Sequence, residues 1–226
     1  MSVRPPVLFI GPSLPRAEVE ALLEVEVDIR PPVRRGDFDA LPSDVDLVGV
    51  VDGVFFSDQA VSPREILGAL RRGVRTLGSS SMGALRAAEL DAFGMEGVGD
   101  VYRMYVCGEV ESDADVALAF DPDTTRAMTE PMVNVIHMLR LATSAQVLDQ
   151  ATADRVLAVA RGIYFFDRTY RALLARLRQT LTQSTVDRLE EFVADHAVEG
   201  DLKRADAIVA IHRLNQLALR TSSGRG

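Results

Sequence analysis

The sequence predicts an α/β fold, with a parallel, Rossmann-like or flavodoxin-like sheet in the N-terminal half and an all-helical C-terminal half. In the first half, short apolar runs alternate with stretches of helical periodicity, which indicates a parallel sheet covered by helices on both faces. From about Ser112 onward, the apolar residues recur at helical spacing. We therefore expect an α/β domain at residues 1–108, a helical domain at 109–219 and a disordered tail at 220–226.

The expected elements of the first half follow one another closely. The strands are predicted at Val7–Ile10, Val25–Ile29, Asp46–Val51 and Val74–Leu77, and the helices at Pro15–Leu23, Ser62–Arg71 and Met82–Leu90. Pro63 suits the first turn of its helix, where its missing N–H has no partner to lose. A turn-rich link is expected at Pro31–Leu41, and the glycine-rich stretch Gly94–Gly99 is expected to lead into a strand near Val101–Val106.

The second half is predicted to be a series of helices. Their expected ranges are Asp113–Ala119, Pro131–Thr143, Ala145–Gln150, Thr152–Tyr164, Arg168–Thr180, Ser184–His196 and Leu202–Leu219. Ser144 and Ser184 are expected to be N-caps, because a serine hydroxyl can accept a hydrogen bond from the first turn of a helix. The single cysteine, Cys107, is expected to be a small half-buried apolar residue.

Composition excludes several classes of function. The chain has 226 residues, of which 47% are hydrophobic, and a net charge of −8. A negative charge argues against nucleic acid as a partner. The apolar run Val7–Ile10 ends at Gly11-Pro12, too short for a signal peptide or a membrane span. One cysteine excludes a disulfide within the chain and a cysteine-cluster metal site, which suits a reducing, cytoplasmic setting. We expect no metal and no cofactor.

Small and polar residues follow three of the predicted strands. Gly11-Pro12-Ser13 follows the first strand, Asp52-Gly53 the third and Ser79-Ser80-Ser81 the fourth. Ligands of open parallel sheets bind outside the carboxyl ends of the strands, so these loops are expected to line one crevice. The alternative is that glycine and serine are simply the residues that tight turns between strands and helices use.

The segment from Gly78 to Glu89 contributes most to the functional prediction. A strand, three serines and a helix start are the parts of a turn that binds an anion or presents a nucleophile, because the first N–H groups of a helix are free. Ser81-Met82-Gly83 is a loose version of the nucleophile elbow, whose strict pattern has Gly where this chain has Ser79. The pattern by itself favours the alternative that Ser81 is a helix N-cap.

Seven stretches of the chain have the character of family motifs. They are Phe9–Pro15, Asp52–Phe55, Glu65–Leu67, Ser80–Leu90, Phe93–Gly99, Glu130–Asn134 and Lys203–Ala207. Because these stretches match motifs of the TfuA-like family in the same order, the chain resembles that family from about Val7 to Ile211.

The resemblance implies a role in installing backbone thioamides during the biosynthesis of ribosomally made peptide natural products, or on a protein target. It implies two partners, a YcaO-type ATP-dependent cyclodehydratase or thioamide synthetase and a thiocarboxylated, ubiquitin-like (ThiS-like) sulfur carrier. The implied activity is the hydrolysis of the carrier's C-terminal thiocarboxylate, which releases sulfide. The alternatives are a non-catalytic adaptor that docks the carrier and the synthetase together, and a generic module that binds an anion or a nucleotide.

The chain departs from the family pattern at one point. Family members commonly have His-Lys-Glu-Ile before the second helix, where this chain has Pro63-Arg64-Glu65-Ile66. A buried lysine can lose its proton and act as a base, whereas arginine cannot. Either this protein works differently from its relatives, or the position only holds an anion and Arg64 suffices.

The serine turn and the resemblance together suggest a set of site residues. Hydrolysis of a thiocarboxylate is acyl transfer to water, which needs a nucleophile, a base and an oxyanion site. Ser81 is expected to be the nucleophile or a ligand of the substrate, with the backbone N–H groups of Met82 and Gly83 at the oxyanion. The further residues expected to bind substrate are Gly11, Ser13 and Ser80.

Charged residues complete the expected site. An anionic thiocarboxylate resists attack, so Arg64 and Arg86 are candidates to help it, although Arg86 equally suits an i,i+3 ion pair with Glu89. Asp52 is a candidate to orient or deprotonate the nucleophile, against the favoured alternative of an ordinary Asp-Gly turn.

Three polar residues farther along the chain share one helix face. Glu130, Asn134 and His137 are spaced so that they form a polar stripe, which either closes over the crevice or faces solvent. The resemblance supports a catalytic role for Glu130 and substrate binding by Asn134, and it does not support His137. The basic segment Lys203-Arg204 is expected either to pair with the first domain or to bind a partner.

Overall fold

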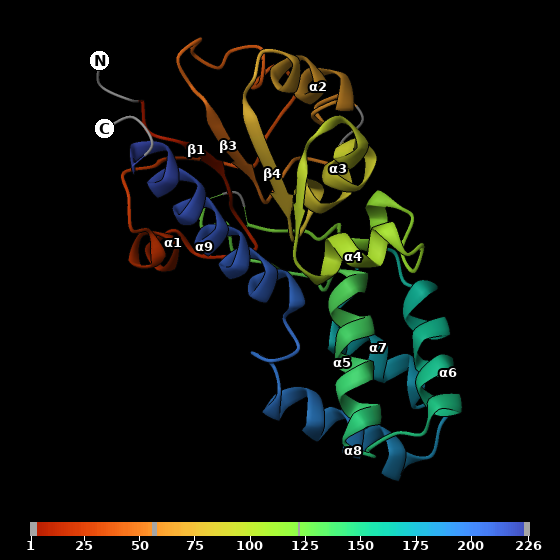
Figure 1. The fold of residues 1–226 in the computed structure, drawn as a ribbon. Coiled ribbons are helices and arrows are strands. Elements are labelled where there is room, and N and C mark those ends of the chain that lie inside the picture. The colour runs from red at the N-terminus through yellow and green to blue at the C-terminus, as the bar shows by residue number, and fades with distance from the viewer. Residues whose placement is uncertain (1–3, 56–57, 122, 224–226) are drawn as a thin grey trace. The chain divides into compact units, whose positions relative to one another are not determined.

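The structure is a computed structural model, and it describes residues 4–55, 58–121 and 123–223 (Figure 1). The chain divides into two compact units, one of Met1–Asp113 with Lys203–Gly226 and one of Ala114–Leu202. This division groups residues 203–226 with the α/β unit, whereas the sequence predicts a helical domain that extends to residue 219.

The α/β unit contains a five-stranded sheet in which every pair is parallel. Its strands are β1 (Val7–Phe9), β2 (Asp28–Arg30), β3 (Leu47–Val50), β4 (Arg75–Ser79) and β5 (Glu96–Val98). The strand order β2-β1-β3-β4-β5 is the order of a flavodoxin-like doubly wound sheet. The predicted α/β class is confirmed, and the order reverses between β1 and β3, which places a topological switch point there.

Helices cover both faces of the sheet, as the predicted parallel arrangement requires. They are α1 (Arg16–Leu22), α2 (Pro63–Arg71), α3 (Met82–Leu90), α4 (Asp100–Val106) and α9 (Leu202–Ser223), and a 3₁₀ turn, η1 (Asp91–Phe93), follows α3. Val50 belongs to the core layer that includes Ile66 of α2 and Ala87 of α3. Leu77 belongs to the opposite layer, which α1 and α9 complete through residues such as Val19 and Ile211 (Figure 1).

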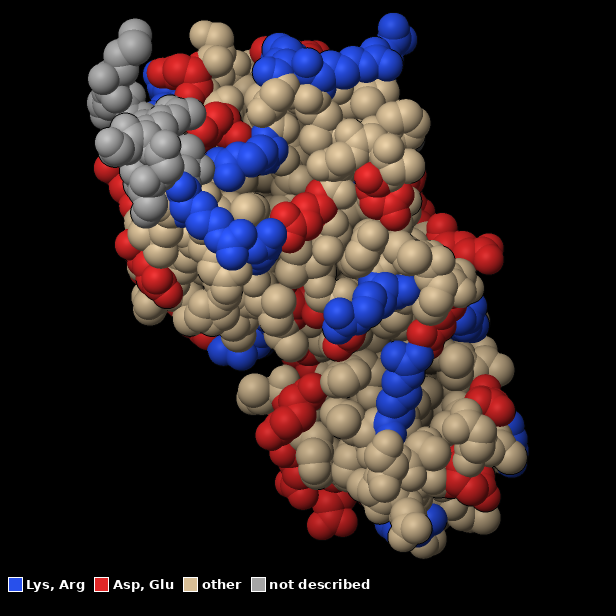
Figure 2. Space-filling model, in the orientation of Figure 1, with Lys and Arg blue, Asp and Glu red and all other residues tan. Residues whose placement is uncertain are grey.

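The second unit is helical, and its helices are α5 (Met132–Ser144), α6 (Gln150–Arg161), α7 (Tyr170–Leu177) and α8 (Gln183–Asp195). Asp149 and Thr182 cap α6 and α8 by accepting hydrogen bonds from backbone N–H groups of the first turn. Exposed acidic side chains gather over α8 and the residues after it (Figure 2). They belong to Asp187, Glu190, Glu191, Asp195 and Glu199.

The structure corrects the predicted path between β4 and the helical unit. Residues 100–106 form α4 and not a strand, and the strand of this region is β5, three residues long. The helix begins after Gly99 because Asp206 of α9 accepts hydrogen bonds from the backbone N–H groups of Asp100 and Val101. This cap is supplied from a distant part of the chain, so no local pattern predicts it.

Several smaller predictions also fail. Residues 145–149 are not helical, and Ser144 is the last residue of α5 and not an N-cap. Ser184 lies inside α8, and the helix predicted at 113–119 is only a 3₁₀ turn, η2 (Asp113–Asp115). Residues 220–223 continue α9, while 224–226 lie outside the described residues. Cys107 is exposed, because it follows the end of α4.

Among the described residues, no helix combines the length and the apolar character that crossing a membrane requires.

Candidate functional site

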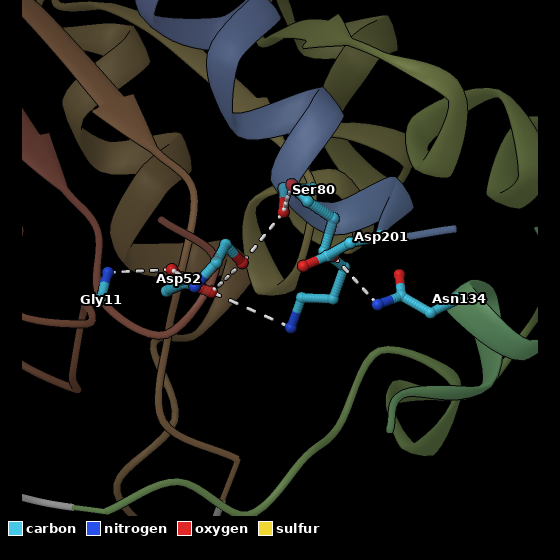
Figure 3. A network of polar contacts seen from close by, with 7 residues as sticks. Gly11, Asp52, Ser80, Asn134 and Asp201 are labelled. Atoms are coloured by element: carbon cyan, nitrogen blue, oxygen red, sulfur yellow. Dashed lines mark hydrogen bonds and ion pairs between the residues drawn. The ribbon is translucent and has the colours of Figure 1, made fainter. Parts of the chain in front are cut away.

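A buried carboxylate lies at the switch point of the sheet. Asp52 follows β3 and is 1% exposed. Its Oδ2 accepts hydrogen bonds from the backbone N–H groups of Gly11 at 2.9 Å and Ser13 at 3.0 Å, and its Oδ1 accepts one from the Ser13 hydroxyl at 2.7 Å (Figure 3). The structure therefore brings Gly11, Ser13 and Asp52 together, but the two amides hold the carboxylate and are not free for a ligand.

The serine turn between β4 and α3 is tight. Ser80 has a φ of +63°, and the N–H of Ser81 donates to the carbonyl of Ser79 at 2.7 Å. A residue with positive φ between a strand and a helix is the geometry of a nucleophile elbow, and it is costly for any residue except glycine. The sequence pattern predicts the elbow at Ser81, whereas the residue with the strained φ is Ser80.

Two glycines make this turn possible. A Cβ at Gly78 would lie 2.1 Å from the carbonyl oxygen of Gly83, and a Cβ at Gly83 would lie 1.8 Å from the carbonyl oxygen of Val50. Helix α3 consequently starts against the ends of β3 and β4, which no larger residue would allow.

The three serine hydroxyls of the turn have different partners. Ser79 donates to the carbonyl of Val98 at 2.8 Å and contacts that of Asp206 at 3.1 Å, which ties the ends of β4, β5 and α9 together. The Ser80 hydroxyl lies 3.0 Å from Ser13 Oγ and 2.8 Å from the carbonyl of Lys203. The Ser81 hydroxyl is buried and has no hydrogen-bond partner among the described residues.

Lys203 is the site residue that sequence reasoning missed. It lies in the first turn of α9 with 1% exposure, and its Nζ is 3.9 Å from Asp52 Oδ1. An opposite charge at this distance offsets the cost of burying the carboxylate. The available signal was a lysine inside the motif stretch Lys203–Ala207, but the sequence did not show which residue it contacts.

Of the two backbone N–H groups predicted to form the oxyanion site, one already donates a hydrogen bond within the protein. The N–H of Gly83 donates to the carbonyl of Val51 at 3.2 Å, so it is already used. The N–H of Met82 makes no hydrogen bond within the described part of the chain and remains available beside the Ser81 hydroxyl. The Met82 side chain packs in the core.

Neither predicted arginine contacts the serine turn among the described residues. Arg64 is exposed in the first turn of α2, a helix that Ser62 and Glu65 cap reciprocally. Arg86 donates to the carbonyl of Val61 at 2.9 Å and pairs with Glu89 at 2.6 Å. The ion pair, one of the two alternatives for Arg86, is therefore present.

Glu130 and Asn134 belong to the helical unit, where they line a cavity of about 120 Å³. The predicted polar stripe is wrong for Glu130, which precedes the N-cap Pro131 of α5 and lies outside the helix. Asn134 donates from Nδ2 to Asp201 Oδ1 at 3.0 Å (Figure 3). The same cavity is lined by Tyr170, whose pKa is raised by burial and further by the charges of Glu130 and Asp201. The phenol consequently stays neutral and can act as a hydrogen-bond donor. His137 contacts the carbonyl of Glu199 at 3.1 Å.

The residues that the structure describes contain no group of three or more His, Cys, Asp or Glu side chains placed to hold a metal ion.

The fold and the turn define a flavodoxin-like α/β protein with buried hydroxyls at its switch point. The family model described as "TfuA-like protein" matches residues 52–169, which is more than half of the chain. The chain belongs to the TfuA-like family. The matched range includes Asp52, the serine turn, Glu130 and Asn134, whereas Ser13 and Lys203 lie outside it. No curated protein matches the chain.

Proposed function

We propose that this protein releases sulfide from the C-terminal thiocarboxylate of a ThiS-like sulfur carrier and so serves a YcaO-type thioamide synthetase in the biosynthesis of ribosomally made peptide natural products. The observation that carries the activity is the buried serine turn at the switch point, with the Ser80 hydroxyl 3.0 Å from Ser13 Oγ and Ser13 bonded to Asp52. Family membership supports the pathway. The reducing cytoplasm is the compartment that suits such sulfur chemistry.

Each requirement of acyl transfer has a candidate among the site residues. Ser80 and Ser81 offer hydroxyl nucleophiles, and Asp52 offers a proton acceptor that reaches Ser80 through Ser13. The Met82 N–H and the Ser81 hydroxyl offer donors for the developing oxyanion. Lys203 offers positive charge to an anionic tail, and this charge acts strongly because the site is buried.

A non-catalytic adaptor is the second candidate, and one observation favours it. Ser80 and Ser81 are 0% and 1% exposed, and a carrier tail must reach one of them for acyl transfer. The exposed Arg64, in place of the lysine of family members, would suit the docking of an anionic partner better than proton transfer.

The test uses the purified full chain and a thiocarboxylated carrier. We expect sulfide to appear together with a carrier whose terminal sulfur has been replaced by oxygen, which intact-mass measurement detects. The double variant Ser80→Ala, Ser81→Ala should lose release, and Ser184→Ala, at an exposed position on α8, should retain it. Stable complexes with carrier and synthetase but no sulfide would favour the adaptor instead.

A further inference from the structure

We infer that the two adjacent serines divide the chemistry of the site, with Ser80 as the nucleophile and Ser81 as a hydrogen-bond donor to the substrate. This assignment rests on the proposed function. It moves the nucleophile from Ser81 to Ser80 and keeps for Ser81 the second role that the sequence suggested, that of a ligand of the substrate. Backbone geometry and hydrogen bonding, two different kinds of observation, carry it.

The backbone singles out Ser80. It is the residue of positive φ at the end of β4, and non-glycine residues with this conformation cost free energy that the fold must offset. A glycine would adopt the same φ without strain. The chain nevertheless has a side chain here, and that side chain is a hydroxyl.

Hydrogen bonding connects Ser80 to a proton acceptor. The Ser13 hydroxyl donates its only proton to Asp52 Oδ1 at 2.7 Å, so its contact with Ser80 at 3.0 Å requires Ser80 to be the donor. Ser80 also has a single proton, and the Ser13 oxygen shares it with the carbonyl of Lys203, which accepts at 2.8 Å. A proton that leaves Ser80 can therefore pass to Ser13 while the Ser13 proton passes to Asp52.

Ser81 has the opposite character. Its hydroxyl is buried without a partner among the described residues, which costs free energy in the absence of a ligand. Its proton has no hydrogen-bond acceptor among the described residues. With the neighbouring Met82 N–H, it forms a pair of donors at the start of α3, which suits an oxygen that gains negative charge.

The reaction balances with the residues of the site. Ser80 Oγ bonds to the thiocarboxylate carbon while its proton passes through Ser13 to Asp52. The carbon–sulfur bond breaks, the electron pair stays on sulfur, and Lys203 protonates the sulfur, which leaves as hydrosulfide. Asp52 returns its proton to Lys203, 3.9 Å away. Water then hydrolyses the Ser80 ester: its oxygen bonds to the carbonyl carbon, one of its protons goes to Ser80 Oγ as the ester bond breaks, and the carboxylic acid that forms loses its proton to solvent.

The assignment predicts different defects for the single variants. Ser80→Ala should abolish both sulfide release and the ester between carrier and protein. Ser81→Ala should still form the ester, with kcat lowered about 100-fold, as for the loss of one oxyanion donor. Asp52→Asn should slow ester formation, because the acceptor of the proton is lost.

The experiment locates the ester by acid quenching and peptide mapping after the chain is mixed with thiocarboxylated carrier. A fluorophosphonate probe, which reacts with activated serines, gives a second readout that needs no sulfur chemistry.

Modification of Ser80 by carrier or probe supports the assignment. Modification of Ser81, or sulfide release without any modified serine, overturns it. A chain that releases no sulfide but is labelled at Ser80 keeps the assignment and refutes only the proposed function, whereas a chain labelled at neither serine refutes the assignment.

Discussion

Two polar regions, one in each unit, contain residues of the family motifs, and they differ in what surrounds their charges. Around Asp52, donors from residues 11–13 and an ammonium from α9 contact a carboxylate that is almost fully buried. Around Asn134 and Tyr170, polar side chains line a cavity of about 120 Å³. The first region depends on close packing of several chain segments, whereas the second keeps open space. Substitutions in the first region should therefore lower the free energy of unfolding far more than substitutions in the second.

The largest effect is expected at Gly83. Gly83→Ala would place a Cβ 1.8 Å from a backbone carbonyl oxygen, which cannot move without displacing β3. We expect a loss of about 4 kcal/mol in the free energy of unfolding, or no folded protein. Gly68→Ala in α2 is the matched control, because its nearest neighbour would be 3.8 Å away, and it should stabilise by about 0.5–1 kcal/mol. Urea unfolding measures both, and a Gly83→Ala protein as stable as the wild type would contradict the close approach.

The second-largest effect is expected at the buried ion pair between Lys203 and Asp52. Lys203→Met leaves the Asp52 carboxylate buried beside an apolar side chain, and we expect a loss of about 3 kcal/mol in the free energy of unfolding. Asp52→Asn added to Lys203→Met should recover part of the loss, since the unpaired charge is gone. The exposed pair Arg16–Glu20 is the control, and its removal should change stability by less than about 0.5 kcal/mol. Equal losses at the two pairs would refute the proposed importance of burial.

Asp206 of α9 is a second buried ionisable residue of the α/β unit, and we expect its effect on the free energy of unfolding to depend on pH. Burial raises its pKa from 3.8 to about 6, against the lowering effect of its hydrogen bonds from the Asp100 and Val101 N–H groups and the charge of Arg103. A raised pKa in the folded state stabilises the protein at low pH, and that contribution is lost as pH rises through 6. Between pH 5 and 7.5, the wild type should lose about 1.4 kcal/mol relative to Asp206→Asn. Parallel stability curves for the two proteins would rule out this titration.

The smallest effect is expected in the cavity of the helical unit. Asn134→Ala removes the hydrogen bond to Asp201, and we expect a loss of about 1 kcal/mol in the free energy of unfolding. The cost is modest because water can enter a polar cavity and replace the amide. Val135→Ala, a change in the packed core on the same helix, is the control and should cost about 2 kcal/mol. If Asn134→Ala proved as harmful as Lys203→Met, the contrast between the two regions would not hold.

Local sequence signals predicted much of the fold. Apolar runs predicted β1, β3 and β4, and periodicity with Pro63 in the first turn predicted α2. The helix predicted at Met82–Leu90 is observed with those bounds. Prediction failed where the deciding contact is distant, as at residues 100–106, where the cap of α4 comes from Asp206.

The candidate site divides in the same way. The sequence by itself determined that hydroxyls, a carboxylate and glycines follow the strands of a parallel sheet, because strand and turn signals are local and parallel topology gathers the carboxyl ends. Only the tertiary structure decided that Ser80 has the strained φ, that Ser81 is left without a partner among the described residues and that Lys203 reaches Asp52. These three facts depend on how α3 and α9 pack against the sheet, and packing joins residues that lie far apart in the chain.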